Sequence, residues 1–394
     1  DLRDSQAARI FLLTLWRAAM TPKEFAERLP DTAFAFRGYN FTNIGRTAEL
    51  MADPRYCEPI ERYLRRAEAV FRGVLNRQVE LVERVRRGED TSLETYAEAV
   101  AIIVAVEMAQ LEILERQFQI EYQKARLAFG YSLGEIGALI ASGSLEFESA
   151  LMIPLSLAED CAALAYDVTL AVLFSRAKMI PYATVERLCV RISSEGRGVI
   201  GISAVLSPNS FLLMGQGETI ERFRAIMGEL PEKTYLRKND HRWPPLHTPI
   251  VRQRSIPDRA ATLMNSMVGG FTVPQPPVLS LVTGAASYND YNAREMLHRW
   301  TDEPQRLWDV VTQTLIQDIR TIVHVGPEPN LIPATYTRLK DNVEAQTRGS
   351  IGMRALSVVA SRPWLKSLLP EQTALLRAPM VRQVTLEDWL LEQP

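Results

Sequence analysis

The chain of 394 residues is long enough for two or three domains, or for one large α/β domain with an insertion. Its formal net charge of -2 gives no basic excess, which argues against a nucleic-acid-binding protein. No stretch approaches the roughly 18 uninterrupted apolar residues that a membrane span needs. We therefore expect a globular protein that neither binds nucleic acid nor crosses a membrane.

The three cysteines, at positions 57, 161 and 189, have no spacing typical of a metal site or a redox motif. We predict reduced thiols, no bound metal and a cytoplasmic location. The start of the chain is acidic and lacks a small-residue cleavage site, so no signal peptide is expected.

The first 120 residues are predicted to be mostly helical. Residues 6–28 have the spacing of an amphipathic helix, and Thr32–Phe36 form a short apolar strand. Helices are expected from about 54 to 120. Within this region Tyr96–Ile120 is apolar and free of Gly and Pro, which predicts a buried helix.

Residues 130–134 read Gly-Tyr-Ser-Leu-Gly and fit the G-x-S-x-G pattern of a nucleophile elbow. An apolar strand over 125–129 leads into the motif, and an apolar helix over 136–141 leads out of it. In an elbow the serine occupies a sharp strand-to-helix turn, and the flanking glycines let strand and helix approach closely. Ser132 is therefore the candidate nucleophile.

The segment 166–240 has the order β-α-β-β-α-β, which is typical of a ferredoxin-like subdomain. Its predicted elements are Val168–Phe174, Ala183–Val190, Val199–Leu206, Phe211–Met214, Gly217–Met227 and Lys233–Leu236.

Alternation of strands and helices then returns. The expected elements are a strand at Pro277–Val282, helices at Asn292–Trp300 and Pro304–Ile319, and a strand at Thr321–Val325. From about 346 the chain is a Pro-punctuated tail. We predict an α/β fold in which a hydrolase-like parallel-sheet domain, 1–165 and 241–394, contains the ferredoxin-like subdomain, 166–240, and ends in an extension, 346–394.

A serine hydroxyl needs a base within hydrogen-bond reach, and histidine is the commonest one. His298 and His241 lie among polar residues and are expected at the surface. His247 lies between prolines in Pro-Pro-Leu-His-Thr-Pro, a rigid loop that could hold an imidazole in place. His324 lies in an apolar strand. The residues alone leave both His247 and His324 as candidates.

These motifs together resemble the malonyl-CoA:acyl-carrier-protein transacylases and polyketide-synthase acyltransferase domains. The elbow GYSLGEIGALIASG, the His-Thr-Pro loop at 247–249, Val-Thr-Gly at 282–284 and Val-Gly-Pro at 325–327 stand in the order of that family over about residues 32–345. The resemblance implies acyl transfer from acyl-CoA through an acyl-serine to the phosphopantetheine thiol of an acyl carrier protein, with no bound cofactor.

The resemblance also implies roles for individual residues. Ser132 and His247 are the catalytic pair, and a main-chain carbonyl near Gly326–Pro329 orients the histidine. The amides of Leu133 and Tyr39 form the oxyanion hole, although the family's Gln-Gly-Ser-Gln loop is not preserved around Tyr39. The residues assigned to substrate binding are Tyr131, Leu157 and Asn209.

One departure from the family bears on the substrate. The arginine that pairs with the malonyl carboxylate aligns with Leu157, and Tyr131 replaces the usual histidine before the serine. Burying a carboxylate without a cation costs several kcal/mol. We therefore expect an acyl group without a free carboxylate. The alternatives are a conventional malonyl transferase, a thioesterase or hydrolase on the same fold, and an inactive relative that binds carrier proteins.

Overall fold

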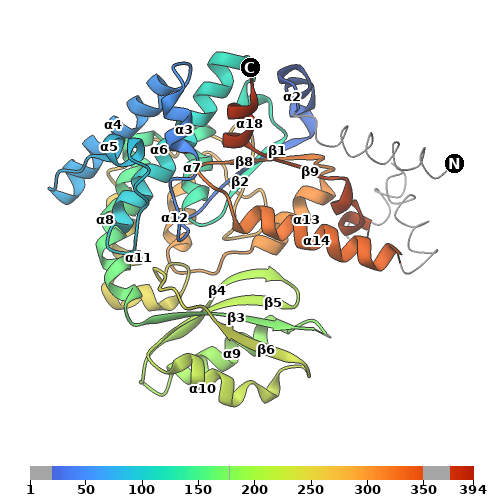
Figure 1. Cartoon of the computed structure of the whole chain (residues 1–394). Coiled ribbons are helices and arrows are strands. Elements are labelled where there is room, and N and C mark those ends of the chain that lie inside the picture. Colours follow the sequence, from blue (N-terminus) through green and yellow to red (C-terminus); the bar gives the residue numbers. More distant parts are fainter. Residues whose placement is uncertain (1–19, 177, 349–372) are drawn as a thin grey trace.

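The computed structural model describes residues 20–176, 178–348 and 373–394. It contains a five-stranded and a four-stranded sheet, and Figure 1 shows the smaller sheet below the larger one. The chain forms part of the larger sheet, then the whole of the smaller one, and then returns to the larger sheet. The predicted fold class is therefore confirmed. The division into domains at residues 166 and 241 remains our proposal.

Helices account for much of the chain. The longer ones are α4 (Cys57–Leu75), α6 (Tyr96–Phe118), α8 (Phe147–Ala165), α9 (Tyr182–Ser193) and α14 (Leu331–Arg348). The shorter ones are α2 (Pro22–Arg28), α3 (Thr47–Ala52), α5 (Leu81–Arg86), α7 (Leu133–Ala141), α10 (Thr219–Ile226), α11 (Ile256–Met264), α12 (Ala293–Trp300), α13 (Leu307–Ile316) and α18 (Leu386–Glu392). Short 3-10 turns are η1 (Leu29–Asp31), η2 (Tyr122–Lys124), η3 (Met227–Glu229), η4 (Pro249–Arg254) and η5 (Leu375–Met380).

The larger sheet is parallel and has the strand order β7-β2-β1-β8-β9. Its strands are β1 (Thr32–Phe36), β2 (Leu127–Gly130), β7 (Val278–Leu279), β8 (Thr321–Val325) and β9 (Arg382–Thr385). The central strands β1, β2 and β8 are buried along their whole length. Their continuous apolar sequences follow from this position, because helices cover both faces of a parallel sheet. The residues that follow β1 and β2 at their carboxyl ends line the same cavity as residues of the smaller sheet.

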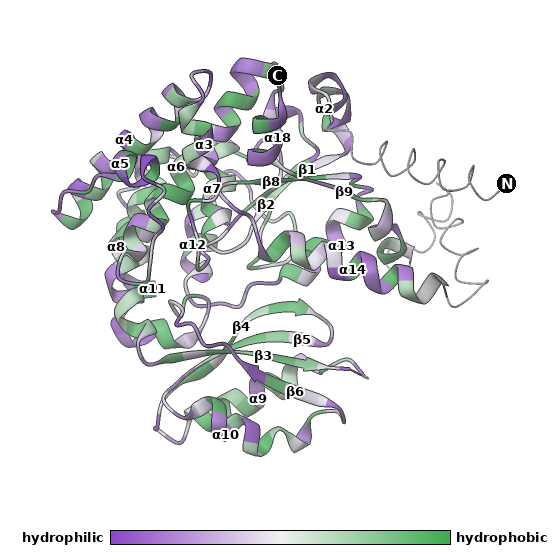
Figure 2. Cartoon of the chain, in the orientation of Figure 1, coloured by the Kyte–Doolittle hydropathy of each residue, from purple (hydrophilic) through white to green (hydrophobic). Residues whose placement is uncertain are grey.

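Two apolar clusters cover the two faces of the larger sheet. One contains residues of α4, α6, α7 and α8, and the other contains residues of α13, α14 and η5. Figure 2 shows the apolar sides of these helices turned inward. The helix α6 is buried along most of its length and contacts α7, as its uninterrupted apolar sequence predicts.

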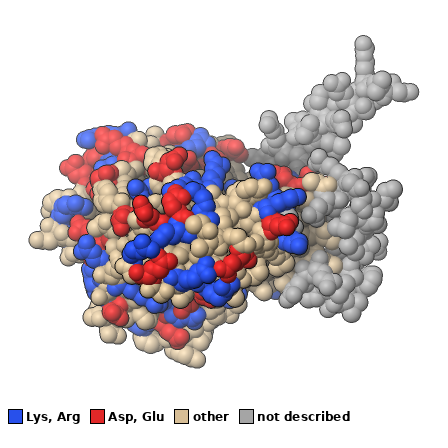
Figure 3. Space-filling model, turned by 90° about the horizontal axis from the view of Figure 1, so that it is seen from below, with Lys and Arg blue, Asp and Glu red and all other residues tan. Residues whose placement is uncertain are grey.

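The smaller sheet is antiparallel, with the strand order β4-β5-β3-β6. Its strands are β3 (Val168–Ser175), β4 (Ile200–Ser207), β5 (Ser210–Gln216) and β6 (Thr234–Lys238), and α9 and α10 connect them in the predicted ferredoxin-like order. The face seen in Figure 3 carries Lys and Arg interspersed with Asp and Glu. Ion pairs such as Arg187–Glu229 and Lys238–Glu221 account for part of this mixture.

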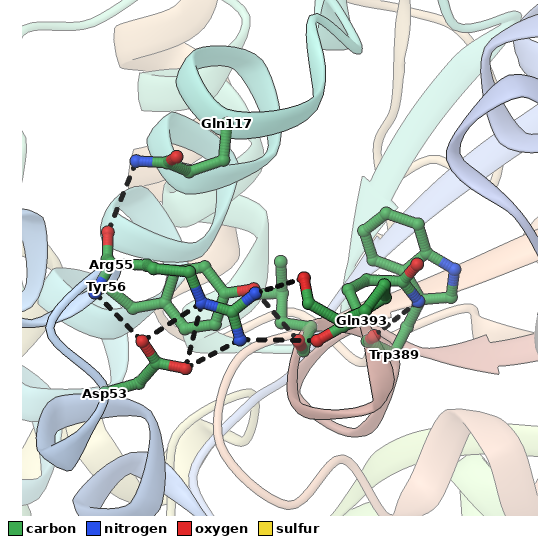
Figure 4. Close-up of polar contacts among 8 residues, drawn as sticks. Asp53, Arg55, Tyr56, Gln117, Trp389 and Gln393 are labelled. Carbon is green, nitrogen blue, oxygen red and sulfur yellow. Dashed lines mark hydrogen bonds and ion pairs between the residues drawn. The ribbon is translucent and has the colours of Figure 1, made fainter.

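The segment 373–394 belongs to the larger sheet and the helices around it, whereas the sequence predicted a tail from about residue 346. Its strand β9 pairs with β8, and α18 packs beside α3. Figure 4 shows the polar contacts that Arg55 and Tyr56 make with it. The Arg55 guanidinium donates to the carbonyl of Gln393 at 3.2 Å, the Tyr56 hydroxyl donates to that of Leu390 at 3.1 Å, and the Trp389 indole donates to that of Met20 at 2.6 Å.

Other predicted elements differ from the structure in extent. The strand expected over Pro277–Val282 is reduced to the two residues of β7, and α14 is absent from the predicted elements. The amphipathic helix expected over 6–28 lies partly outside the described residues, and its described part forms α2. Among the described residues, no helix combines the length and the apolarity that a bilayer crossing requires.

Candidate active site

Ser132 lies in the turn between β2 and α7, as the elbow motif predicts. Its backbone has φ 54° and ψ −118°, a conformation that a non-glycine residue adopts only under strain. A Cβ at Gly130 would lie 2.0 Å from the carbonyl oxygen of Gly134, and one at Gly134 would lie 2.3 Å from the carbonyl oxygen of Phe36. Only glycine fits either position, which lets helix α7 start against the ends of β1 and β2.

His247 is the histidine that the structure brings to this serine. Its Nε2 lies 2.7 Å from the Ser132 hydroxyl oxygen, although the two residues are 115 positions apart. The imidazole is 3% exposed, and burial lowers its pKa to about 4. The ring is therefore neutral near pH 7 and can accept the serine proton. His247 also has a positive φ of 66°, so the proline-rich loop holds it in a strained conformation.

Trp300, the last residue of α12, orients both members of this pair. Its carbonyl oxygen lies 2.7 Å from Nδ1 of His247, and its indole N–H donates to the carbonyl of Ser132 at 2.9 Å. Because a carbonyl can only accept, Nδ1 carries the proton and Nε2 presents its lone pair to the serine. The expectation of an orienting carbonyl near Gly326–Pro329 is wrong, because the carbonyl that contacts Nδ1 belongs to Trp300 at the end of α12.

Gln305 is a second buried residue that the sequence did not identify as part of the site. Its side-chain oxygen accepts from the main-chain amide of Ser132 at 3.1 Å, and its main-chain N–H donates to the carbonyl of Ser203 in β4 at 2.8 Å. It thereby links the elbow to the smaller sheet. No motif marks Trp300 or Gln305, since each acts through contacts distant in sequence.

Two main-chain amides beside the serine fit an oxyanion hole. Within the described residues, the amides of Leu133 and Tyr39 donate no hydrogen bond. The loop after β1 lies against the elbow, since a Cβ at Gly38 would be 3.2 Å from the Cβ of Ser132. This close approach supports the predicted pair of donors.

Arg37 holds this loop in place through side-chain hydrogen bonds. It is 3% exposed and donates to the carbonyls of Gly38 at 2.9 Å and Thr42 at 3.0 Å, to Oδ1 of Asn43 at 2.9 Å, and to the carbonyl of Pro327. Burial lowers its pKa to about 10, and the nearby acids Glu107, Glu328 and Glu387 oppose that shift. The hydrogen bonds of the Arg37 guanidinium thus hold the backbone of the loop after β1 and the carbonyl of Pro327.

The Ser–His pair opens into a cavity of about 250 Å³ between the two sheets. The larger sheet and its loops contribute Ala35, Arg37, Gly38, Tyr39, Asn40, Tyr96, Tyr131, Ser132, His324, Pro329, Asn330, Leu331, Ile332 and Pro333. The small sheet and the segment after it contribute Leu170, Val172, Ser203, Leu212, Met214, Asn239, Trp243, Pro244, Leu246 and His247. Arg37 is the one Lys or Arg side chain in this lining.

The structure places the predicted substrate-binding residues differently. Tyr131 lines the cavity beside the nucleophile. Leu157 is not in the lining, because its side chain packs into the apolar core from α8. Asn209 is exposed in the β4–β5 turn, where its amide donates to the carbonyl of Ser175 at 2.7 Å. Neither Leu157 nor Asn209 is in the cavity lining, so their assignment to substrate contact stays a prediction that this cavity does not support.

The remaining histidines also differ in position. His241 and His298 are exposed, as expected. His324 is buried in β8 and lines the cavity, but His247 and not His324 contacts Ser132. No group of His, Cys, Asp and Glu within the described ranges could hold a metal ion.

An elbow serine, a histidine oriented by a carbonyl and a ferredoxin-like insertion between them define a class of α/β proteins with a serine–histidine site. No family model matches the chain. The malonyl CoA-acyl carrier protein transacylase of Bacillus subtilis is 23% identical over 267 residues, 66% of this chain. The match spans 62% of the length of that relative.

Solved structures identify the fold. An acyl carrier protein S-malonyltransferase from Vibrio cholerae is 17% identical with a TM-score of 0.62, over 90% of this chain and 96% of that one. The acyltransferase domain from module 8 of the salinomycin polyketide synthase is 19% identical with a TM-score of 0.61, over 78% and 67% of the two chains. The chain has the fold of these transacylases and acyltransferase domains, and the resemblance predicted from its motifs is confirmed.

Proposed function

We propose that the protein is an acyltransferase that moves an acyl group from coenzyme A to the phosphopantetheine thiol of an acyl carrier protein. The observation that carries this proposal is the 2.7 Å contact between Ser132 and a neutral His247 at the mouth of a largely apolar cavity. The fold comparisons support a transferase, since the similar solved structures are those of an S-malonyltransferase and an acyltransferase domain.

The mechanism has two halves. His247 Nε2 takes the hydroxyl proton as the oxygen of Ser132 attacks the thioester carbonyl. The amides of Leu133 and Tyr39 stabilise the negative oxygen, and such donors contribute about 3 kcal/mol in the transition state. The C–S bond breaks, and the protonated His247 returns the proton to the leaving CoA thiol. In the second half the pantetheine thiol gives its proton to His247 and its sulfur attacks the acyl ester. The ester C–O bond breaks, and His247 returns the proton to the oxygen of Ser132.

The acyl group lacks a free carboxylate in this proposal. Counting from Ser132 puts Leu157 at the family's cation position, but the support for this proposal comes from the cavity lining, in which Arg37 is the one Lys or Arg side chain. Arg37, the one guanidinium at the cavity, already donates to three carbonyls and one side-chain oxygen. A malonyl carboxylate would enter without a partner, at a cost of several kcal/mol.

The test is intact-mass measurement of the full chain mixed with hexanoyl-CoA, acetyl-CoA or malonyl-CoA. We expect an adduct of the hexanoyl or acetyl mass that is absent from Ser132→Ala, and malonyl transfer at least about a hundredfold slower. Equal malonyl labelling would contradict the substrate class. No adduct with any thioester would contradict the transferase itself.

The acceptor is tested on the preformed acyl-enzyme. Free pantetheine is added, and acyl-pantetheine is compared with free acid by mass spectrometry. Transfer to the thiol faster than release to water supports a transferase. Release as acid at the same rate with and without pantetheine would indicate a hydrolase on this fold.

A further inference from the structure

Gln305 contacts the main chain of the nucleophile. The residue is fully buried, and its side-chain oxygen accepts from the main-chain N–H of Ser132 at 3.1 Å. Because a main-chain N–H can only donate, the side chain of Gln305 must present its oxygen, and not its nitrogen, to Ser132. The contact by itself therefore assigns the orientation of this amide.

The backbone of Gln305 is held independently of that contact. Its N–H donates to the carbonyl of Ser203, and its carbonyl accepts from the N–H of Val205, both at 2.8 Å. These two bonds pair Gln305 with Ala204 of β4 in a parallel bridge. The glutamine oxygen thus reaches Ser132 from a main chain that the smaller sheet holds in place.

The other end of the same amide has no favourable contact. Nε2 of Gln305 is buried and has no hydrogen-bond partner among the described residues. A buried NH2 group without a partner lowers stability, which offsets the gain from the bond to Ser132. Stability alone therefore does not explain a glutamine here, and the position of its oxygen is what distinguishes it from an apolar side chain.

The bond acts on a strained residue. Ser132 has φ 54° and ψ −118°, and a backbone persists in such a conformation only where its surroundings hold it there. Gln305 binds the N–H of Ser132, and the indole of Trp300 binds its carbonyl. Loss of the bond to Gln305 would let the turn relax and move the hydroxyl away from Nε2 of His247.

We propose that Gln305 is a positioning residue for acylation, whose side-chain oxygen fixes the main chain of Ser132 so that its hydroxyl stays aligned with His247. This inference rests on the proposed acyltransferase function. It also makes the alignment of the nucleophile depend on the smaller sheet, because β4 holds the backbone of Gln305.

Two variants of Gln305 test the role of the oxygen. Gln305→Met removes it and keeps the length of the side chain, whereas Gln305→Glu keeps an acceptor oxygen. Single-turnover acylation is measured by quench and intact mass over a range of hexanoyl-CoA concentrations. We expect Gln305→Met to lower the rate at saturation by about 10- to 100-fold, because a misplacement of about 1 Å can cost about 10²-fold. The half-saturating concentration should not change, and Gln305→Glu should be faster than Gln305→Met.

Gln110→Met is the matched control. Gln110 is also fully buried, its side-chain oxygen accepts from the main-chain N–H of Gly326 at 2.8 Å, and its Nε2 has no partner in the described part of the chain. The two methionine variants therefore lose the same kind of bond, and urea unfolding should show similar losses of stability. Gln110→Met should keep an acylation rate close to that of the unmodified chain.

A fluorophosphonate separates this inference from the proposed function, because it reacts with an activated serine without coenzyme A. Labelling of Ser132 that slows in Gln305→Met but not in Gln110→Met, in a chain that hexanoyl-CoA does not acylate, would retain the positioning role and contradict the transferase. The inference is overturned if the two methionine variants lose equal rate, if Gln305→Glu is no faster than Gln305→Met, or if neither reagent reacts with Ser132.

Discussion

The main-chain carbonyl of Trp300 lies 2.7 Å from Nδ1 of His247 and sets the tautomer that faces the nucleophile. The same residue binds the carbonyl of Ser132 through its indole nitrogen. One buried residue at the end of α12 thus holds the histidine through its main-chain carbonyl and the serine through its side chain. A carboxylate is not needed, because a carbonyl that accepts from Nδ1 orients the ring equally well.

Replacing His247 by alanine removes the proposed base. We expect the rate of acyl-serine formation to fall by about 10²- to 10⁴-fold, because the hydroxyl must then lose its proton to water. Stopped-flow quench followed by intact-mass measurement gives this rate. His298→Ala is the matched control, since that histidine is exposed on α12 and should leave the rate unchanged. Equal rates in the two variants would contradict the assignment.

Trp300→Phe separates the two roles of Trp300. The carbonyl remains on His247, while the indole bond to Ser132 and part of the buried side chain are lost. We expect about 2 kcal/mol less stability in urea unfolding and a slower acylation rate with an unchanged pH profile. A shifted pH profile would show that the indole, rather than the carbonyl, controls the histidine.

The pH dependence of acylation reports the pKa of His247. Because burial lowers that pKa to about 4, the ring stays unprotonated, and therefore competent as a base, as pH falls from 8 to 5. Activity should decline only as pH approaches 4, below the value of about 6.5 for a solvent-exposed histidine. Single-turnover acylation between pH 4 and 8 checks this. A half-maximal rate near pH 6.5 would contradict the buried environment of His247.

Arg37→Met tests the support of the loop that carries Tyr39. The substitution leaves buried carbonyl oxygens without donors and leaves Glu107, whose carboxylate oxygens have no hydrogen-bond partner, without its nearby cation. We expect about 3 kcal/mol lower stability and a lower acylation rate at saturating acyl-CoA. The control is Arg65→Met, because that side chain is 61% exposed and its ion pair with Glu61 contributes at most about 1 kcal/mol. Similar losses in both variants would count against the support role.

Two glycine substitutions give opposite expectations for stability. Gly134→Ala places a Cβ 2.3 Å from the carbonyl oxygen of Phe36, so the elbow must shift and both stability and acylation should fall. Gly73→Ala, in α4, adds a methyl group that meets nothing within 4 Å. It should raise the free energy of unfolding by about 0.5–1 kcal/mol and leave acylation unchanged. Thermal and urea unfolding compare the two, and a harmless Gly134→Ala would contradict the elbow geometry.

Local sequence was sufficient for much of the fold. The strands β1 and β8 begin and end where the sequence predicts, because a parallel strand covered on both faces must be continuously apolar. The turn around Ser132 could also be predicted from the sequence, since its strand, glycine turn and helix are consecutive. The sequence did not predict the strand β9, because β9 is a short edge strand defined by its pairing with β8.

The sequence by itself indicated the candidate nucleophile, the order of the strands along the chain and the loop that carries His247, because each is encoded by neighbouring residues. Only the tertiary structure showed that His247, and not His324, contacts Ser132. It also placed the Trp300 carbonyl and the Gln305 side chain at the site. Leu157 lies in the apolar core. These outcomes depend on distances between segments far apart in the chain. Packing of α12 and β8 against the elbow sets those distances, and no local pattern records them.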